Sequence, residues 1–307
     1  MSSEIQTWSS NGKLLITGEY LVMEGALSLA IPLNVGQSLT IIPNSDKVVH
    51  WQANKPDGHW FFVELDLFNF NVTKTDNYEL AQRLSEILSA TRILSKDFLT
   101  SGIGYNVVTD LEFDPDFGFG TSSTLIANIA SWANVDAYKL LDLTFGGSGY
   151  DIACASSKNP IVFQRIGDSI NVSDVSFDPV FKKNLYFVYL GKKQNSTNSI
   201  SHFKKHSNFT SVDVDAISAI TKELLITSEL AEFEALLAEH ESIMESILNI
   251  PTAKSLYFKD YPGIIKSLGA WGGDFVMLTN HYTEKEFRNL LQEGGFDTVF
   301  SYDSLVM

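Results

Sequence analysis

Residues 114–124, Asp-Pro-Asp-Phe-Gly-Phe-Gly-Thr-Ser-Ser-Thr, form the most informative segment of the sequence. They follow a β-branched segment at 103–111 and precede a segment rich in Ser, Ala, Leu and Ile, so they predict a turn from a strand into a helix. Gly118 and Gly120 permit a tight turn and let a ligand approach the backbone. The unpaired amides and the positive dipole end at such a helix start suit a phosphate. A turn capped by Thr121, without a ligand, is the alternative.

Hydroxyl side chains follow these glycines at Thr121, Ser122 and Ser123. They could donate to phosphate oxygens or coordinate a magnesium ion. No Gly-Lys-Ser/Thr sequence follows the loop, so it is not a Walker A motif.

A second glycine-rich segment, Gly-Gly-Ser-Gly-Tyr-Asp-Ile-Ala at 146–153, also precedes an expected helix. Asp151 can simply be the cap of that helix. Alternatively, its carboxylate faces a cleft and takes a proton from a substrate hydroxyl. The segment by itself favours the cap.

Two further segments are equally ambiguous when each is taken alone. Residues 269–274, Gly-Ala-Trp-Gly-Gly-Asp, precede an expected strand, and their amides either form an anion nest or belong to a loop without a ligand. Residues 12–20, Gly-Lys-Leu-Leu-Ile-Thr-Gly-Glu-Tyr, contain Lys13 and Glu19. By themselves these two side chains suggest an exposed ion pair at a strand end.

Taken in order, these segments resemble the motifs of the GHMP small-molecule kinases, which include galactokinase, homoserine kinase, mevalonate kinase and phosphomevalonate kinase. Residues 12–20 resemble the first motif, 117–123 the phosphate loop and 269–274 the third motif, and the resemblance covers most of the chain. It implies an α+β fold of two domains. These would be an N-terminal ribosomal-protein-S5-like α/β domain at 1–178, which carries the phosphate loop, and a ferredoxin-like C-terminal domain at 179–307.

The resemblance also implies a role for each residue that falls on a motif. Asp151 would be the catalytic base, Lys13 would neutralise charge near the transferring phosphoryl group, and Ser122 would hold magnesium. The residues implied to bind the phosphates of ATP are Gly118, Gly120, Thr121, Ser122, Ser123, Gly269, Gly272 and Gly273. Those implied to bind the acceptor are Glu19, Tyr20, Ser148, Gly149, Lys192, Ser196 and Thr197.

Details of these segments resemble the phosphomevalonate kinase branch. They are Gly-Glu-Tyr at 18–20, Gly-Ser-Gly-Tyr-Asp at 147–151 and Asp274. We therefore expect an enzyme that uses ATP and Mg²⁺ to phosphorylate 5-phosphomevalonate, or mevalonate, on the isoprenoid route. A non-catalytic homologue that senses a nucleotide or metabolite, and a GHMP kinase for a sugar or homoserine, are the alternatives.

Basic residues near an expected helix start bear on the acceptor. Lys192 and Lys193 come between a strand and that helix, and with the amides near Ser196 and Thr197 they suit an anion. A basic loop followed by an ordinary helix cap is the alternative.

The chain departs from the family pattern in two places. The stretch between Ser122 and Asp151 is shorter than relatives usually have, so we expect only one helix between the motifs. Asp142 is the candidate there for a second magnesium carboxylate. Trp271 stands where the third motif usually has glycine, and its ring could narrow the nucleotide site or stack on a ligand.

Composition limits the possible partners. Among 307 residues, 22 Lys and Arg face 37 Asp and Glu, giving a net charge of −15, which argues against a binder of bulk nucleic acid. There is no visible signal peptide or membrane-spanning run. Cys154 is the only cysteine, and we expect it to be packed in the helix after Asp151. We expect a cytoplasmic monomer or homodimer whose partner is a small-molecule acceptor, with no nucleic acid or membrane partner.

Hydrophobic patterning gives the expected elements. The strands are 13–17, 37–43, 48–52, 59–67, 103–111, 161–164, 185–190, 274–279 and 298–302, and the helices are 77–94, 121–133, one from about 151, 212–227 and 228–249. Trp51, Trp60, Phe61 and Phe62 are interpreted as strand residues, with adenine stacking as the alternative. The acidic residues of the last helix are interpreted as a solvated face; they are Glu232, Glu234, Glu239, Glu241 and Glu245.

Overall fold

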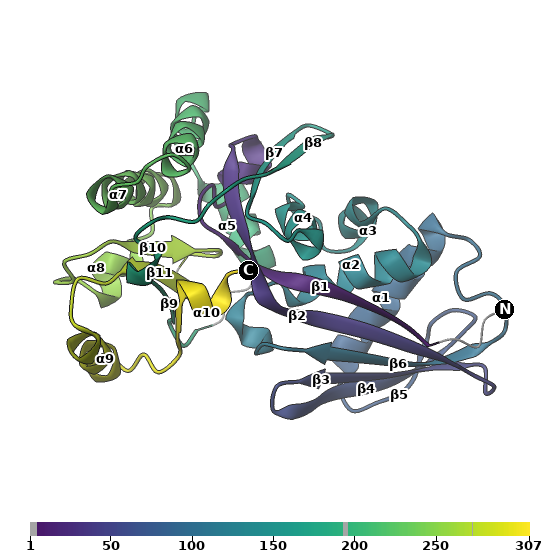
Figure 1. Cartoon of the computed structure of the whole chain (residues 1–307). Helices are drawn as coiled ribbons and strands as arrows, with labels where there is room; N and C mark the ends of the chain where they lie inside the picture. The colour runs from purple at the N-terminus through teal and green to yellow at the C-terminus, as the bar shows by residue number, and fades with distance from the viewer. Residues whose placement is uncertain (1–4, 193–195, 272) are drawn as a thin grey trace. The chain divides into compact units, whose positions relative to one another are not determined.

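A computed structural model describes residues 5–192, 196–271 and 273–307 of the chain (Figure 1), apart from the side chains of 196–198 and 206. Its contacts divide the chain into two compact units. The first consists of Met1–Gly12, Val35–Pro115 and Phe119–Ser156, and the second of Lys13–Asn34, Asp116–Gly118 and Ser157–Met307. The predicted division into domains at residue 178 stays a prediction.

The first unit contains a sheet in the order β5-β4-β3-β6-β2, and β1 also pairs with β2. β3 and β6 are parallel, whereas β6 runs antiparallel to the part of β2 from Gln37 to Asn44. The strands are β1 (Gln6–Leu15), β2 (Ser28–Asn44), β3 (Val48–Lys55), β4 (Gly58–Asp66), β5 (Val72–Thr75) and β6 (Gly104–Leu111). Residues 13–15 of β1 and 28–34 of β2 are counted in the second unit.

Helices of the first unit share one hydrophobic core with these strands. In α1, Leu84, Ile87 and Leu88 are buried on one face, and Asn77 caps the helix by accepting from the amide of Leu80 at 3.2 Å. The helices are α1 (Tyr78–Leu94), α2 (Thr121–Ala133), α3 (Ala137–Thr144) and α4 (Tyr150–Ser156).

In the second unit, β7 pairs with the first residues of β2, and β8 pairs with β7. The unit also contains a separate antiparallel sheet in the order β10-β11-β9-β12. The strands are β7 (Ile161–Ile166), β8 (Ser169–Asp174), β9 (Leu185–Tyr189), β10 (Ile265–Leu268), β11 (Phe275–Thr279) and β12 (Val299–Ser301). The helices are α5 (Ser196–His206), α6 (Ser211–Leu224), α7 (Leu230–Leu248), α8 (Ala253–Tyr257), α9 (Glu284–Glu293) and α10 (Tyr302–Leu305).

The predicted α+β class is confirmed by these two sheets with their helices. The bounds predicted for α2 agree with the structure, and Cys154 is buried in α4 as expected. Two predictions were wrong. Two helices, α2 and α3, lie between Ser122 and Asp151 instead of one. Glu241 is 4% exposed, so it does not belong to a solvated face of α7. Among the described residues, no helix has the length and apolar character needed to cross a membrane.

Candidate functional site

Residues 117–123, called the phosphate loop here after their predicted role, form the expected turn into a helix. Gly118 and Gly120 have φ of 70° and 100°, values that glycine adopts readily. Helix α2 begins at Thr121, and no side chain at the N-cap position satisfies its first amides. The hydroxyl of Ser123 donates to the carbonyl of Gly120 at 2.9 Å, so it stabilises the turn. The first amides of α2 are therefore the groups best placed to receive an anion.

The first motif contacts the phosphate loop through Lys13. Its Nζ donates to the carbonyl oxygen of Gly118 at 2.8 Å. Gly12 also lies close to this loop, within the first unit: a β-carbon on Gly12 would lie 3.2 Å from the carbonyl oxygen of Phe119. These contacts bring one predicted catalytic residue to the loop.

The third motif reaches the same glycine through Asp274. A β-carbon on Gly118 would lie only 2.8 Å from Asp274 Oδ2, and one on Gly269 would lie 3.8 Å from it. Asp274 has a left-handed φ of 55°, which is uncommon for a residue with a side chain. Its amide donates to the carbonyl of Lys192 at 2.7 Å. The second unit thus assembles Lys13, Gly118 and the third motif in one place, while Gly272 lies outside the described residues.

Trp271 connects the third motif to Tyr20. The backbone amide of Trp271 donates to the hydroxyl of Tyr20 at 3.1 Å, and the ring of Tyr20 stacks on Phe203 of α5 with 5.2 Å between centroids. Burial raises the pKa of Tyr20, which keeps its hydroxyl protonated. The indole Nε1 of Trp271 is enclosed and has no hydrogen-bond partner among the described residues. A buried donor without an acceptor is costly, so this group would gain from a ligand oxygen.

Of the residues predicted to bind an anionic acceptor near the start of α5, the structure describes the side chain of Lys192 but not those of Ser196 and Thr197. Lys192 is exposed, and its Nζ lies 3.5 Å from the hydroxyl of Tyr257 and 5.6 Å from the centre of that ring. Ser196 and Thr197 begin α5, as the predicted helix start requires, but their side chains lie outside the described residues.

Asp151 lies in the first turn of α4, in the first unit, where it is half-buried. Its Oδ1 accepts from the amide of Ile152 at 3.1 Å. Ser148 is buried, and a β-carbon on Gly149 would meet the ring of Tyr138 at 2.9 Å. Burial, together with the charge of Asp151, raises the pKa of Tyr138 to about 12. Tyr138 therefore stands beside the predicted base as a neutral phenol.

A cavity of about 530 Å³ opens in the first unit beside the start of α2. Thr121 and Ser122 contribute to its lining, and Oγ1 of Thr121 is buried without a hydrogen-bond partner among the described residues. Aromatic side chains form much of the remaining wall; they are Trp51, Trp60, Phe61, Tyr78 and Phe145. Three of the residues interpreted as strand residues thus also line a cavity next to the predicted phosphate site.

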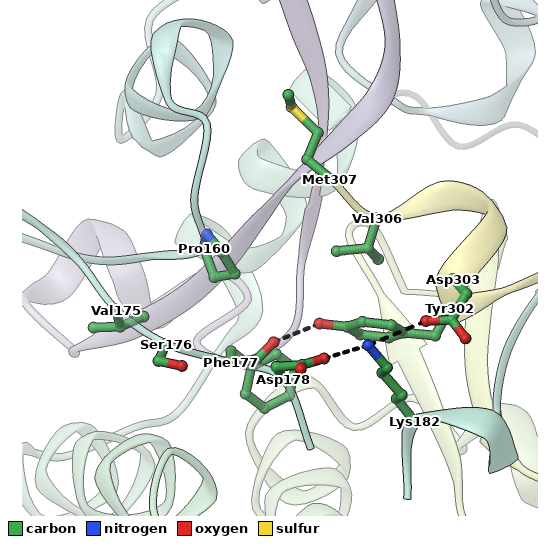
Figure 2. A pocket seen from close by; sticks show the side chains of 10 residues that line it. All are labelled: Pro160, Val175, Ser176, Phe177, Asp178, Lys182, Tyr302, Asp303, Val306 and Met307. Carbon is green, nitrogen blue, oxygen red and sulfur yellow. Dashed lines mark hydrogen bonds and ion pairs between the residues drawn. The ribbon is translucent and has the colours of Figure 1, made fainter. Parts of the chain in front are cut away.

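A second cavity, of about 360 Å³, lies in the second unit (Figure 2). Lys182 there is held by Asp178 at 2.6 Å and Asp303 at 3.3 Å, and the hydroxyl of Tyr302 donates to the carbonyl of Phe177 at 2.6 Å. These polar groups bind one another, so this cavity is a weaker candidate for a ligand site.

Glu19 does not form an exposed pair with Lys13. Its side chain is 1% exposed and bonds the ammonium of Lys266, a residue on β10. His240 and Glu241 of α7 lie against the same groups. This burial favours a structural role for Glu19. The sequence did not indicate that Lys266, His240 and Glu241 would contact it.

No protein-family model matches the sequence, and no curated protein matches it. Solved structures do match in fold. The mevalonate kinase of Methanococcus jannaschii aligns with a TM-score of 0.67 at 16% identity, covering 98% of each chain. The phosphomevalonate kinase of Streptococcus pneumoniae, in complex with phosphomevalonate and AMPPNP, aligns with a TM-score of 0.69 at 15% identity, over 96% of this chain and 99% of that one.

The galactokinase of Lactococcus lactis, in complex with galactose, aligns with a TM-score of 0.68 at 12% identity, over 97% of this chain and 92% of that one. The scores are alike for kinases of different acceptors, so the likeness concerns the fold and leaves the acceptor open. The chain has the two-sheet α+β fold of the GHMP small-molecule kinases.

Proposed function

We propose that this protein transfers the γ-phosphoryl group of ATP to a small acidic alcohol, first 5-phosphomevalonate and second mevalonate. The observation that carries the proposal is the cavity whose wall combines aromatic rings with Thr121 and Ser122 at the uncapped start of α2. Such a cavity offers flat apolar surfaces to a base and backbone amides to phosphates, which are the two unlike halves of a nucleotide.

ATP would place its adenine among Trp60, Tyr78 and Phe145, and its phosphates over the first turn of α2. The amides of this turn and the dipole of the 13-residue helix favour the negative charge. Lys13 adds a positive charge at the carbonyl of Gly118. The proposal therefore needs no Walker A lysine.

Asp151 would accept the proton of the acceptor hydroxyl as it attacks the γ-phosphorus, while Lys13 neutralises charge on the phosphoryl oxygens. Phosphoryl transfer depends mainly on positioning and charge neutralisation, so few groups need to take part. The neutral phenol of Tyr138 beside Asp151 leaves the carboxylate as the basic group of that pair.

Magnesium fits the residues at the start of α2. The hydroxyl of Ser122 is exposed at the cavity, and Mg²⁺ is usually held by few protein oxygens together with substrate phosphates. Ser122 would hold the ion, which when bound offsets phosphate charge. Among the described residues there is no cluster of three or more His, Cys, Asp or Glu that would hold a metal alone.

An anionic acceptor is supported by Lys192, which is exposed just before α5 and whose carbonyl is fixed by the amide of Asp274. A non-catalytic nucleotide sensor is the second candidate, because the buried ring of Trp271 takes up space in the third motif.

ADP release measured with ATP and Mg²⁺ tests the proposal. The acceptors would be 5-phosphomevalonate, mevalonate, homoserine and galactose, and Asp151→Asn is the control for contaminating kinases. Turnover on an acidic acceptor that disappears in the variant is expected. ATP binding, measured by a shift in melting temperature, without turnover on any acceptor would favour the sensor. Absence of both would refute nucleotide binding at α2.

A further inference from the structure

Four ionisable side chains are sealed together inside the second unit. Glu19, His240 and Lys266 are each at most 1% exposed, and Glu241 is 4% exposed. The ammonium of Lys266 bonds Oε1 of Glu19 and lies 3.2 Å from Oε1 of Glu241. The hydroxyl of Ser267 donates to the other oxygen of Glu241 at 3.0 Å. Buried charges are costly unless they are paired, so the protonation of this cluster is constrained.

Charge balance indicates that one carboxyl carries a proton. Lys266 supplies one positive charge, whereas Glu19 and Glu241 would supply two negative charges if both were ionised. Burial holds the pKa of His240 well below its usual value, so the imidazole is neutral and cannot offset the second charge. One carboxyl must therefore be protonated for the cluster to be neutral.

Hydrogen-bond geometry places that proton on Glu19. The amide of Gly18 donates to Nε2 of His240 at 3.0 Å, so this nitrogen carries a lone pair and not a hydrogen. Oε2 of Glu19 lies 3.2 Å from the same nitrogen. Two lone pairs would repel each other at this distance, whereas a proton on Oε2 turns the contact into an attraction. Burial raises the pKa of Glu19 to about 7 and raises the pKa of Glu241 as well, while Lys266 lowers both. The contact with Nε2 of His240 therefore decides between the two carboxyls.

The cluster is attached to a tight turn of the first motif. Gly18 and Tyr20 have φ of 90° and 59°. A β-carbon on Gly18 would lie 2.0 Å from the hydroxyl oxygen of Ser28, so there is no space for a side chain at this position. Tyr20 in turn holds the backbone of Trp271 in the third motif. The groups that fix this turn from one side are thus the imidazole and the carboxyl of the cluster.

We propose that Glu19, His240, Glu241 and Lys266 form a buried proton-binding site that positions the Gly18–Tyr20 turn, and through Tyr20 the third motif. Glu19 is then a positioning residue that acts in its protonated form. Loss of its proton sets a carboxylate against Nε2 of His240 and leaves an unbalanced charge in the cluster. The titratable groups around the Glu19 carboxyl are His240 and Glu241 from α7, Lys266 from β10, and Tyr20 next in the chain.

The pH dependence of unfolding tests this site without any assay of activity. The pKa of Glu19 is about 7 in the folded state, against an ordinary value of 4.5, so the folded state binds the proton more tightly than the unfolded state does. Below the pKa that Glu19 has in the unfolded state, the contribution of its proton to the free energy of unfolding is fully present. This contribution is lost as the pH rises through the pKa that Glu19 has in the folded state. In this window the unfolding constant should rise about tenfold per pH unit from this group alone.

Glu19→Gln is the decisive variant, because its amide can accept from Lys266 and donate to His240 as the protonated acid does. We expect the difference in unfolding free energy between wild type and Glu19→Gln to change with pH in this window and to level off above it. Glu241→Gln is the matched control: it removes the competing charge, so the wild-type transition should remain but move to lower pH. Parallel pH profiles for wild type and Glu19→Gln would overturn the proposal.

The link from Glu19 to the third motif rests on the proposed function, and it is tested by measurements other than unfolding. Wild-type kcat/KM should fall above about pH 7, and Glu19→Gln should remove that fall. Amide exchange at Gly18 gives a readout without activity. Its protection factor, which is the exchange rate corrected for the intrinsic pH dependence of amide exchange, should fall above the same pH in wild type but stay constant in Glu19→Gln. If no kinase activity is found, the stability and exchange profiles still decide whether the proton site exists. A protection factor at Gly18 that stays constant through this pH range in wild type would refute the coupling.

Discussion

The carboxylate of Asp274 packs against the backbone of Gly118, so that a β-carbon on this glycine would lie 2.8 Å from Oδ2. The third motif and the phosphate loop are thereby fitted to each other within the second unit. Glycine is needed at position 118 for two reasons: a side chain would collide with Asp274, and the backbone has a positive φ. These two requirements can be separated by experiment.

Gly118→Ala should lose more stability than Gly102→Ala. The two glycines have nearly equal φ, 70° and 73°, but a β-carbon on Gly102 would meet nothing within 4 Å. The backbone penalty of about 1–2 kcal/mol is common to both, and only Gly118→Ala also displaces Asp274. Urea unfolding of both variants measures the difference. Equal losses would mean that the contact with Asp274 has no energetic weight.

Asp151→Asn should lower kcat about 10²- to 10⁴-fold while leaving ATP affinity nearly unchanged, because the amide cannot accept the proton of the acceptor. Single-turnover rates and ATP titration measure the two quantities. Tyr138→Phe is the informative companion, since it removes only the neighbouring phenol hydroxyl. A fully active Asp151→Asn enzyme would exclude Asp151 as the base.

Tyr78→Ala should weaken ATP binding, because Tyr78 lines the aromatic cavity. Stacking of a base on an aromatic ring contributes about 1–3 kcal/mol, which corresponds to a rise in Kd of roughly 5- to 150-fold. Phe68→Ala is the matched control, because Phe68 is 85% exposed against 70% for Tyr78 and does not line the cavity. Calorimetric titration with ATP compares the two variants. Equal Kd values would show that adenine does not bind beside Tyr78.

Trp271→Phe should weaken binding of ligands bearing phosphate while largely preserving the fold. The substitution keeps a large aromatic ring and deletes the indole donor that lacks a partner among the described residues. A hydrogen bond to a charged group contributes about 1.5–3 kcal/mol, so we expect a loss of roughly 10- to 150-fold in affinity. Trp8→Phe, a partly buried indole of the first unit, controls for general effects of the exchange. Unaltered affinity would show that the indole N–H of Trp271 does not donate to the ligand.

Local signals explain how much the sequence could predict. Glycines and hydroxyls between a β-branched segment and a helix located the phosphate loop, and regular apolar spacing located α1 and α2. Two elements with weak patterns, β5 and β10, were missed, and each has only four residues. Helix α9 was missed although the sequence marks its start with a capping box, Thr283 and Glu286, and its buried face with Phe287 and Leu291. Sequence alone therefore recovered the parts whose information is local.

The buried cluster shows what local reasoning cannot reach. Glu241 belongs to an acidic helix that looks solvated, and only the packing of α7 against Lys266 reveals its burial. The phenol of Tyr138 lies beside Asp151 because α3, which was not predicted, places it there. Such pairings depend on tertiary contacts between segments that carry no sequence sign of each other.

The second unit combines an early segment, Lys13–Asn34, with the much later residues Ser157–Met307. Thr17 bonds Thr221 across 204 positions, Gly18 bonds His240 across 222, and Glu19 bonds Lys266 across 247. A ribosome delivers residues in order, so the segment Lys13–Asn34 must wait for most of translation before its partners emerge. Its apolar side chains, among them Leu21 and Ile31, would be exposed meanwhile to chaperones or to neighbouring nascent chains.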